Sequence, residues 1–373
     1  MQAELTSFIQ QIISVVTAGA GFSPTPSGQF GPILSDGGRG SGGSAEGPVE
    51  GSAGGGGSPS LAEVSEPLEF HPVGGGSINE AYRIRARDGR QWFCKINDTH
   101  RFPGLFEKER DGLALLAAQR IFRVPSVIAC ETVGTKQVLI LEWIESGARE
   151  GVGGIGSGRG GGQSRGKDGQ SFWRLLGEQL ARLHQVSGDR FGLDSDNYMG
   201  ALPQSNTYSA GWEEFFTQRR LEPQIRLAAD RGLLGSEAIR QFERLYKALP
   251  GIFPEHASPA GLRLQGSAGS TQSALPSLVH GDLWSGNFLC DTEGRPVLID
   301  PAVYFGYPGM DLAMTTLFGG FDRAFYESYA YYSPFPANYR EQWDICNLYP
   351  LLIHLNLFGK SYLGAILDTI QPY

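Results

Sequence analysis

Residues 277–302 read SLVHGDLWSGNFLCDTEGRPVLIDPA, and this stretch decides the fold. Asp282 and Asn287 stand five residues apart in a predicted short loop, and Asp300 follows thirteen residues after Asn287. The strand-like runs NFLC and PVLID flank the turn signal Asp-Thr-Glu-Gly, which predicts a hairpin. Because that hairpin would return Asp300 to the other two residues, we expect a cluster of oxygen ligands that suits Mg²⁺ and phosphate rather than zinc.

Composition limits the classes of protein to consider. The chain has 373 residues, of which 40% are hydrophobic, so it can form one large domain or two modest ones with real cores. Its net charge of -8 and the lack of a strongly basic stretch argue against a nucleic-acid partner. The four cysteines are widely spaced and form no CxxC motif, which favours buried reduced thiols over a zinc site or disulfides. They are Cys94, Cys130, Cys290 and Cys346.

The N-terminal residues 1–18 predict an amphipathic helix rather than a signal peptide. They carry Glu4 and lack a basic leading segment. Apolar residues recur at helical spacing at Leu5, Phe8, Ile9, Ile12, Ile13 and Val16. No apolar run reaches membrane-spanning length, so we expect a cytoplasmic protein without a membrane partner.

The chain's 53 glycines are concentrated in segments, and these segments mark the domain boundaries. Residues 19–61 and 145–170 are glycine-rich, and residues 256–277 are rich in Ser, Ala, Gly and Pro. Such compositions cannot bury enough apolar surface to become ordered, so we predict three flexible inserts. The first two separate the first helix, a small lobe at 62–144 and a large lobe at 171–373, and the third lies within the large lobe.

The small lobe begins with three predicted strands within residues 68–98. Asp88-Gly89 lies between apolar runs and is a strong hairpin signal. Gly74, Gly75 and Gly76 separate the first two strands. They can bring backbone N–H groups close to phosphate oxygens, or they can simply form a tight turn.

Lys95 lies within the apolar run WFCKI, where a lysine commonly extends its ammonium group to solvent. The next predicted helix changes this interpretation. Glu109 shares its apolar face with Leu105 and Leu113, where an unpaired carboxylate would be costly. We therefore expect an ion pair between Lys95 and Glu109, of the kind that orients a lysine towards nucleotide phosphates in kinases.

The final strand of the small lobe runs into a connector at 142–144, whose position suits an adenine ring. From Phe172 onwards the chain is predominantly helical by apolar periodicity. The fold class is thus α+β, with a small antiparallel β lobe before a larger, mainly helical lobe. The oxygen cluster falls near the boundary between the lobes, where clefts form.

The order GGGSINEAYRI, Lys95, Glu109, HGDLWSGN, DPA and DLAMTTLFGGF resembles the fructosamine kinase family, also called ketosamine-3-kinases. That family is similar in fold to aminoglycoside phosphotransferases and protein kinases. The resemblance runs from about residue 62 to the C-terminus, outside the two later inserts. HGDLWSGN followed by DPA is specific to the wider phosphotransferase group, and FGGF with NLYPLLIHLNLFG points to the fructosamine kinase branch.

The resemblance implies a role for each matching residue. Asp282 would accept the proton of the substrate hydroxyl, and Asn287 and Asp300 would bind Mg²⁺. ATP would be held by the segment from Gly74 to Asn79, by the Lys95–Glu109 pair and by the connector from Glu142 to Ile144. Ser77 stands where many members carry cysteine, so a thiol switch is not expected. The catalytic loop would be supported by His280 and Asp311.

Structural roles compete with these assignments. Asp282 can be a turn residue, Asn287 a cap and Asp300 a strand end, but those explanations together do not account for the spacing. Trp284 can be a core aromatic residue, although a wall of the sugar pocket is slightly favoured. The remaining candidates are expected to pack or cap helices, and they are His184, Trp343, His354 and Asn356.

The resemblance thus implies an ATP-dependent kinase for the 3-hydroxyl of ketosamines on protein lysines or free amines, acting as a monomer in deglycation repair. Ribulosamine, erythrulosamine and fructosamine all remain open as substrates. Two alternatives are a phosphotransferase for an aminoglycoside or choline and a nucleotide-binding pseudokinase. The first usually needs an acidic pocket, and the second would be signalled by loss of the Lys, Asp or Asn residues that are all present here.

Overall fold

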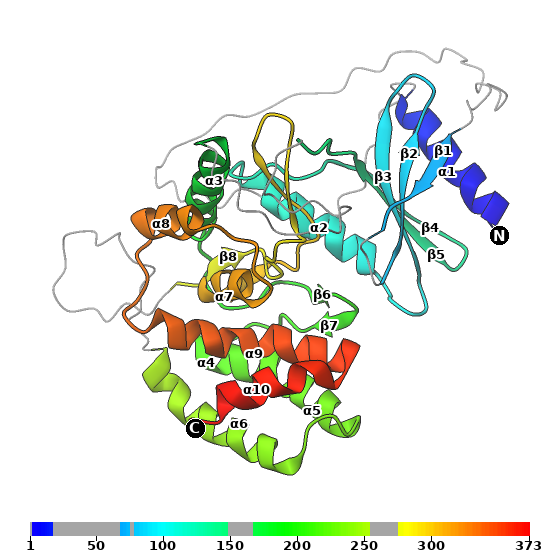
Figure 1. Ribbon diagram of the computed structural model, residues 1–373. Helices are drawn as coiled ribbons and strands as arrows, with labels where there is room; N and C mark the ends of the chain where they lie inside the picture. The colour runs from blue at the N-terminus through cyan, green and yellow to red at the C-terminus, as the bar shows by residue number, and fades with distance from the viewer. Residues whose placement is uncertain (1, 18–67, 75–77, 148–166, 254–274) are drawn as a thin grey trace, which may run out of the picture. The chain divides into compact units, whose positions relative to one another are not determined.

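A computed structural model describes residues 2–17, 68–74, 78–147, 167–253 and 275–373 (Figure 1). Most of the three predicted inserts lies outside these residues. The chain divides into two compact units, Met1–Glu69 with Arg85–Arg90 and Phe70–Ile84 with Gln91–Tyr373.

The first unit contains helix α1 (Gln2–Thr17), which confirms the predicted N-terminal helix. It also contains the predicted Asp88-Gly89 turn. There the Gly89 N–H donates to the Ala86 carbonyl at 3.0 Å, and Gly89 has a φ of 89°. Residues with a side chain rarely adopt this left-handed backbone conformation, which explains why position 89 is a glycine.

The second unit begins with a five-stranded sheet in the order β1-β2-β3-β5-β4. Strands β3 and β4 each pair antiparallel with the largely buried β5, which confirms the small antiparallel lobe. The strands are β1 (Glu69–Pro72), β2 (Glu80–Arg85), β3 (Gln91–Asp98), β4 (Val127–Val133) and β5 (Lys136–Glu142).

Helix α2 (Leu105–Ala118) packs against this sheet. Its Phe106 and Leu113 form a buried cluster with Leu139 and Leu141 of β5. Burial of a side chain of this size contributes about 1.5–3 kcal/mol to stability. This apolar contact therefore fixes which face of α2 is turned towards the sheet.

The rest of the second unit is mainly helical and confirms the larger helical lobe (Figure 1). Helix α3 packs on α8, and α9 packs on α5, α7 and α10. The helices are α3 (Lys167–Leu183), α4 (Trp212–Phe215), the π-helix η1 (Phe216–Leu221), α5 (Glu222–Asp230), α6 (Ser236–Ile252), α7 (Gly309–Leu317), α8 (Arg323–Tyr332), α9 (Tyr339–Phe358), the 3₁₀-helix η2 (Lys360–Tyr362) and α10 (Leu363–Ile370). Among the described helices, none combines the length and apolar character needed to cross a membrane.

The large lobe also contains three short antiparallel strand pairs. The predicted hairpin is confirmed, because β9 (Phe288–Cys290) pairs antiparallel with β10 (Pro296–Leu298). Likewise β11 (Tyr304–Gly306) pairs with β8 (Ser277–Val279), so the last predicted insert ends in a strand. Sequence reasoning missed the third pair, the hairpin of β6 (Asn197–Met199) with β7 (Leu202–Gln204), because three-residue strands show too little alternation to detect.

Gly281 lies in the loop after β8 and has a φ of 84°. A Cβ atom at this position would lie 2.1 Å from the carbonyl oxygen of Ala302. That carbonyl belongs to the segment after Asp300, whose Ala302 N–H donates to the His280 carbonyl at 2.9 Å. The absence of a side chain at Gly281 therefore allows two loops of the large lobe to lie against each other.

We predict that Gly281→Ala lowers the thermal unfolding midpoint, since overpacking and a left-handed alanine together cost about 2–4 kcal/mol. The matched control is Gly364→Ala in α10, where a Cβ would meet nothing within 4 Å. Differential scanning calorimetry should show the control melting at or above the wild-type midpoint. Equal midpoints for Gly281→Ala and the wild type would contradict the tight contact.

Candidate active site

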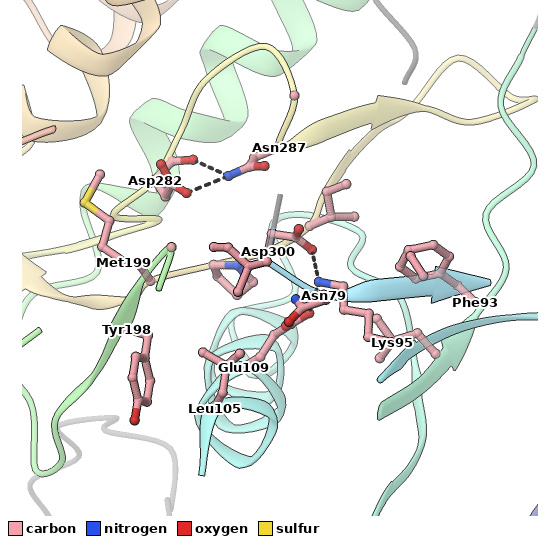
Figure 2. A pocket seen from close by; sticks show the side chains of 18 of the residues that line it. Asn79, Phe93, Lys95, Leu105, Glu109, Tyr198, Met199, Asp282, Asn287 and Asp300 are labelled. Carbon is pink, nitrogen blue, oxygen red and sulfur yellow. Dashed lines mark hydrogen bonds and ion pairs between the residues drawn. The ribbon is translucent and has the colours of Figure 1, made fainter. Parts of the chain in front are cut away.

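Lys95 lies on β3 and contacts carboxylates from two other parts of the chain (Figure 2). Its Nζ atom lies 2.8 Å from Oε1 of Glu109 and 2.6 Å from Oδ1 of Asp300. The expected Lys95–Glu109 pair is therefore present, and Asp300 is a second partner. One ammonium group thus joins the sheet, α2 and the segment that follows β10.

Lys95 remains charged despite its position in the core. Its side chain is only 6% exposed, while the Glu109 side chain is 11% exposed. Burial lowers the pKa of Lys95, but the charges of Asp300 and Glu109 raise it by more, to well above its usual range. Burial raises the pKa of Glu109, and Lys95 opposes this shift. A buried pair of this geometry is held by the attraction between its partners.

Asp300 follows β10 and adopts a left-handed backbone with a φ of 53°. Aspartate tolerates this region better than most residues, but such a conformation at a non-glycine residue is often found at functional sites. The Asp300 side chain is 44% exposed, so it is accessible from the cavity as well as from Lys95. The Ile299 N–H donates to the Asn287 carbonyl at 3.1 Å, which places Asp300 beside the loop of Asn287.

Asp282 and Asn287 are joined by hydrogen bonds within that loop (Figure 2). The Asn287 Nδ2 group donates to Oδ2 of Asp282 at 3.0 Å and to its carbonyl at 2.8 Å. The amide nitrogen of Asn287 is thereby committed to Asp282, which leaves the amide oxygen to face another group. Burial raises the pKa of Asp282 to about 7, the Asn287 hydrogen bond opposes this, and the charges of Asp300 and Asp311 add to it.

His280 and Asp311 both bind the backbone of this loop, as expected of supporting residues. The buried Asp311 accepts from the N–H groups of His280 at 2.7 Å and of Gly281 at 2.8 Å. The ring of His280 lies 3.0 Å from the Ile299 carbonyl through Nε2, and its Nδ1 accepts from the Asp282 N–H at 3.3 Å. Since burial lowers the pKa of His280, the ring is neutral and serves as a fixed spacer between the two loops.

His184 also belongs to this supporting structure, which agrees with its predicted packing role. Its Nε2 lies 3.2 Å from Oδ2 of Asp311, and its Nδ1 lies 2.8 Å from the hydroxyl of Tyr329. The buried ring therefore helps to hold Asp311 rather than reaching a cavity.

Lys95, Asp282, Asn287 and Asp300 line one cavity of about 640 Å³, a size typical of small-molecule sites. Of the predicted residues, Gly74, Asn79, Lys95, Glu109, Glu142, Ile144, Asp282, Trp284, Asn287 and Asp300 all line it. Gly75, Gly76 and Ser77 lie outside the described residues. Asn79 is held in place by a hydrogen bond from Asn97 of β3.

The side chain of Glu142 makes contacts with Arg123 and Ser126 that the sequence did not predict. Its Oε1 lies 2.6 Å from a guanidinium nitrogen of Arg123, and its Oε2 accepts from the Ser126 N–H at 3.1 Å. The carboxylate is thus engaged within the protein, and only the backbone after it is available to a ligand.

Several cavity residues were missed by sequence reasoning. Tyr198, Met199 and Gly200 come from the unpredicted β6–β7 hairpin, and Lys108 comes from α2. His354 was expected only to pack helices, but it also lines the cavity, as does Phe358. The spacing of His354 on the largely buried α9 did not indicate a position on the cavity wall, because core and cavity residues share the same periodicity.

Trp284 lies on the cavity wall, as the pocket interpretation expected. Its ring lies 5.8 Å from that of Phe318, which lies 4.9 Å from the ring of His354. By contrast, Trp343 and Asn356 are buried among the helices, as predicted. The cavity therefore has one aromatic wall built from the loop of Asp282 and the end of α9.

The oxygens of Asn287 and Asp300 form a donor set that fits Mg²⁺. In the described part of the chain, no three His, Cys, Asp or Glu side chains converge as metal ligands, so this candidate site rests on one amide and one carboxylate. Mg²⁺ commonly takes only one or two protein ligands of this kind and keeps waters or substrate phosphates in its other positions.

Comparison with known proteins agrees with the resemblance seen in the motifs. The sequence profile of the fructosamine kinase family matches residues 58–157 and 164–373. A protein of Lactiplantibacillus plantarum described as "Probable ketoamine kinase" is 38% identical over 83% of this chain and 96% of its own length. The "Protein-ribulosamine 3-kinase, chloroplastic" of Arabidopsis thaliana is 32% identical over 83% of this chain and 84% of its own.

A solved structure supports the same conclusion for the fold. A crystal structure from Haemophilus somnus 129PT superposes with a TM-score of 0.66 at 26% sequence identity, covering 83% of this chain and 92% of the other. The family profile, the identity to these relatives and the superposition therefore agree, and the chain belongs to the fructosamine kinase family.

Proposed function

We propose that this protein is an ATP-dependent kinase that phosphorylates the 3-hydroxyl of ketosamines. Its substrates are ribulosamine, erythrulosamine or fructosamine adducts on protein lysines or free amines. The observation that carries this proposal is the convergence of Lys95, Asp282, Asn287 and Asp300 on one cavity. The ketoamine and ribulosamine kinase names of its relatives support the choice of substrate.

ATP binds at the end of the cavity formed by the sheet. The connector after β5 would receive the adenine ring, and the phosphates would lie near Gly74 and Asn79, which line the cavity between β1 and β2. Lys95 supplies a fixed positive charge to those phosphates, because its ammonium group is ion-paired with the Glu109 carboxylate. Preorganised charge of this kind stabilises phosphoryl transfer without reorganisation during the reaction.

Asn287 and Asp300 hold Mg²⁺ through the oxygens described above. When bound, the ion neutralises charge on the phosphates and helps to align them for transfer. Asp300 is suited to this role because its carboxylate is open to the cavity while one oxygen contacts Lys95.

Asp282 orients the acceptor hydroxyl and takes its proton. The Asn287 amide occupies Oδ2 of Asp282, which leaves Oδ1 for the incoming hydroxyl. Hydrogen bonds to Asp311 and His280 hold the backbone from His280 to Asp282 itself, so the carboxylate has little freedom to move. Most of the rate acceleration then comes from positioning and charge stabilisation.

The acceptor end favours an uncharged sugar over a polycation. Its walls include Trp284, Met199 and His354. Of the four acidic residues among the described lining, Glu109 and Asp300 bind Lys95 and Glu142 binds Arg123, so only Asp282 has a neutral partner, Asn287. A site for an aminoglycoside or choline would be expected to offer unpaired carboxylates.

Phosphorylation at the 3-hydroxyl makes the sugar adduct labile, so the cellular consequence is deglycation repair. We place this activity in the cytoplasm and in a monomer. The cytoplasmic assignment fits the four widely spaced free thiols.

The proposal predicts ATP-dependent transfer of ³²P to ribulosyl-lysine, erythrulosyl-lysine or fructosyl-lysine by the purified protein with Mg²⁺. Asp282→Asn should lower this rate by about 10²- to 10⁴-fold, since it removes the proton acceptor. Transfer to kanamycin or choline with none to the ketosamines would contradict the proposal, as would full activity of Asp282→Asn.

Thermal unfolding of Asp282→Asn shows whether its loss of activity is caused by loss of folding. Burial raises the pKa of Asp282 to about 7 in the folded state, so its ionised form is disfavoured there relative to the unfolded chain. The stability contributed by this group therefore falls as the pH rises through 7. At pH 8, which lies about one unit above that value, Asp282→Asn should melt no lower than the wild type.

A separate prediction concerns the pH dependence of the reaction. Asp282 accepts a proton only when ionised, so kcat/KM should rise between about pH 6 and pH 8, with a half-maximum near the Asp282 pKa of about 7. The residual rate of Asp282→Asn should not show this rise. A wild-type half-maximum near the ordinary aspartate value of about 4 would show that burial does not set the catalytic ionisation.

A further inference from the structure

The connector after β5 is anchored to the protein at both ends. At its start, the Glu142 N–H donates to the Ser126 carbonyl at 2.8 Å. At its end, the Gly147 N–H donates to the Cys290 carbonyl at 3.0 Å, and Ser146 forms a bridge with Asp291. The first anchor belongs to the small sheet and the second to the β9–β10 hairpin.

Arg123 bridges these two anchors with one guanidinium group. One of its nitrogens lies 2.6 Å from Oε1 of Glu142, and the other lies 2.7 Å from Oδ2 of Asp291. The backbone of Arg123 is fixed as well, because its carbonyl accepts from the Leu298 N–H of β10 at 3.0 Å. A planar guanidinium that contacts two carboxylates sets the separation between them, which a point charge cannot do.

Between the anchors, Trp143 and Ile144 line the cavity. Among the described residues, neither makes a backbone hydrogen bond to the protein. The Trp143 side chain contacts other side chains of the protein, with the Arg83 guanidinium 4.6 Å from its ring centre and its Nε1 donating to Glu145 at 2.9 Å. Two consecutive residues thus keep backbone donors and acceptors for a ligand, as recognition of a purine edge requires.

The ion pairs of Arg123 are poorly suited to a role in stability alone. The side chains of Arg123 and Glu142 are each 33% exposed, and pairs at such positions contribute little to folding. Asp291 is 1% exposed and has a second cation, Arg295, at 2.9 Å, so it does not depend on Arg123 for neutralisation. Among the described side chains, Arg123 is the one that links Asp291 to Glu142.

We propose that Arg123 is a positioning residue for nucleotide binding, which holds the connector so that the backbone of Trp143 and Ile144 meets the adenine ring. This inference rests on the proposed ATP-dependent activity and adds a determinant outside the cavity lining. Arg123 is not among the residues that line the cavity, so its effect should be confined to affinity for the nucleotide.

The test compares wild type with Arg123→Met, which keeps much of the stem but loses the bridge. Isothermal titration calorimetry should show the Kd for MgATP rising at least about fivefold, the lower end of ordinary couplings between sites. In steady-state assays, KM for ATP should rise in parallel, while kcat and the acceptor KM stay within about twofold of wild type. Unchanged ATP binding, or an equal loss in kcat and acceptor KM, would overturn the inference.

Arg295→Met is the matched control, because it removes an arginine from the same Asp291 carboxylate without touching Glu142. It should bind MgATP as the wild type does, and a loss equal to that of Arg123→Met would show that neutralisation of Asp291 is what matters. If Arg123→Met fails to fold, Arg123→Lys provides the test, since one ammonium group cannot span both carboxylates and should weaken ATP binding in the same direction.

A double-variant cycle identifies the residue through which Arg123 acts. Glu142→Gln should weaken ATP binding, and combining it with Arg123→Met should add little further loss. If the two losses in ATP-binding free energy are fully additive, Arg123 does not act through Glu142. Wild-type protein that binds no ATP at all would refute the proposed function itself, whereas wild-type binding with an unaffected Arg123→Met refutes only the inference.

Discussion

The contact on which the rest of the site depends is the pairing of one buried ammonium with two carboxylates from distant parts of the chain. Lys95 in β3 can remain charged in the core only because Glu109 and Asp300 lie 2.8 and 2.6 Å from it. An uncompensated charge there would be strongly unfavourable. The sheet, α2 and the segment after β10 are therefore tied to one point, and the cavity forms around it.

This constraint explains features that look unrelated along the sequence. The apolar packing of α2 on β5 turns Glu109 towards Lys95, and the β9–β10 hairpin returns Asp300 to the same place. Asp300 adopts a left-handed backbone there, and Gly281 lacks a side chain so that the neighbouring loop can approach. Asp282 and Asn287 then lie beside Asp300 without any long-range contact of their own to Lys95.

Local sequence patterns predicted those parts of the site that depend on spacing and charge. The Asp-Thr-Glu-Gly turn indicated the hairpin, and a carboxylate on an apolar helix face indicated the Lys95–Glu109 pair. The patterns could not show that Asp300 also binds Lys95, because that contact spans 205 residues of chain. The β6–β7 hairpin was too short to detect, and the position of His354 on the cavity wall depends on how α9 packs. Glu142 lay at the predicted connector, but its pairing with Arg123 is a tertiary contact without a sequence signal.

The central claim is that the Lys95 contact preorganises a site for MgATP, and a crystal structure with Mg²⁺ and a non-hydrolysable ATP analogue tests it most directly. We predict that Lys95 keeps Glu109 and contacts the phosphates, while the oxygens of Asn287 and Asp300 bind the ion. The purine should contact the backbone of Trp143 and Ile144. A nucleotide bound elsewhere, or a metal ion that contacts neither Asn287 nor Asp300, would contradict this account.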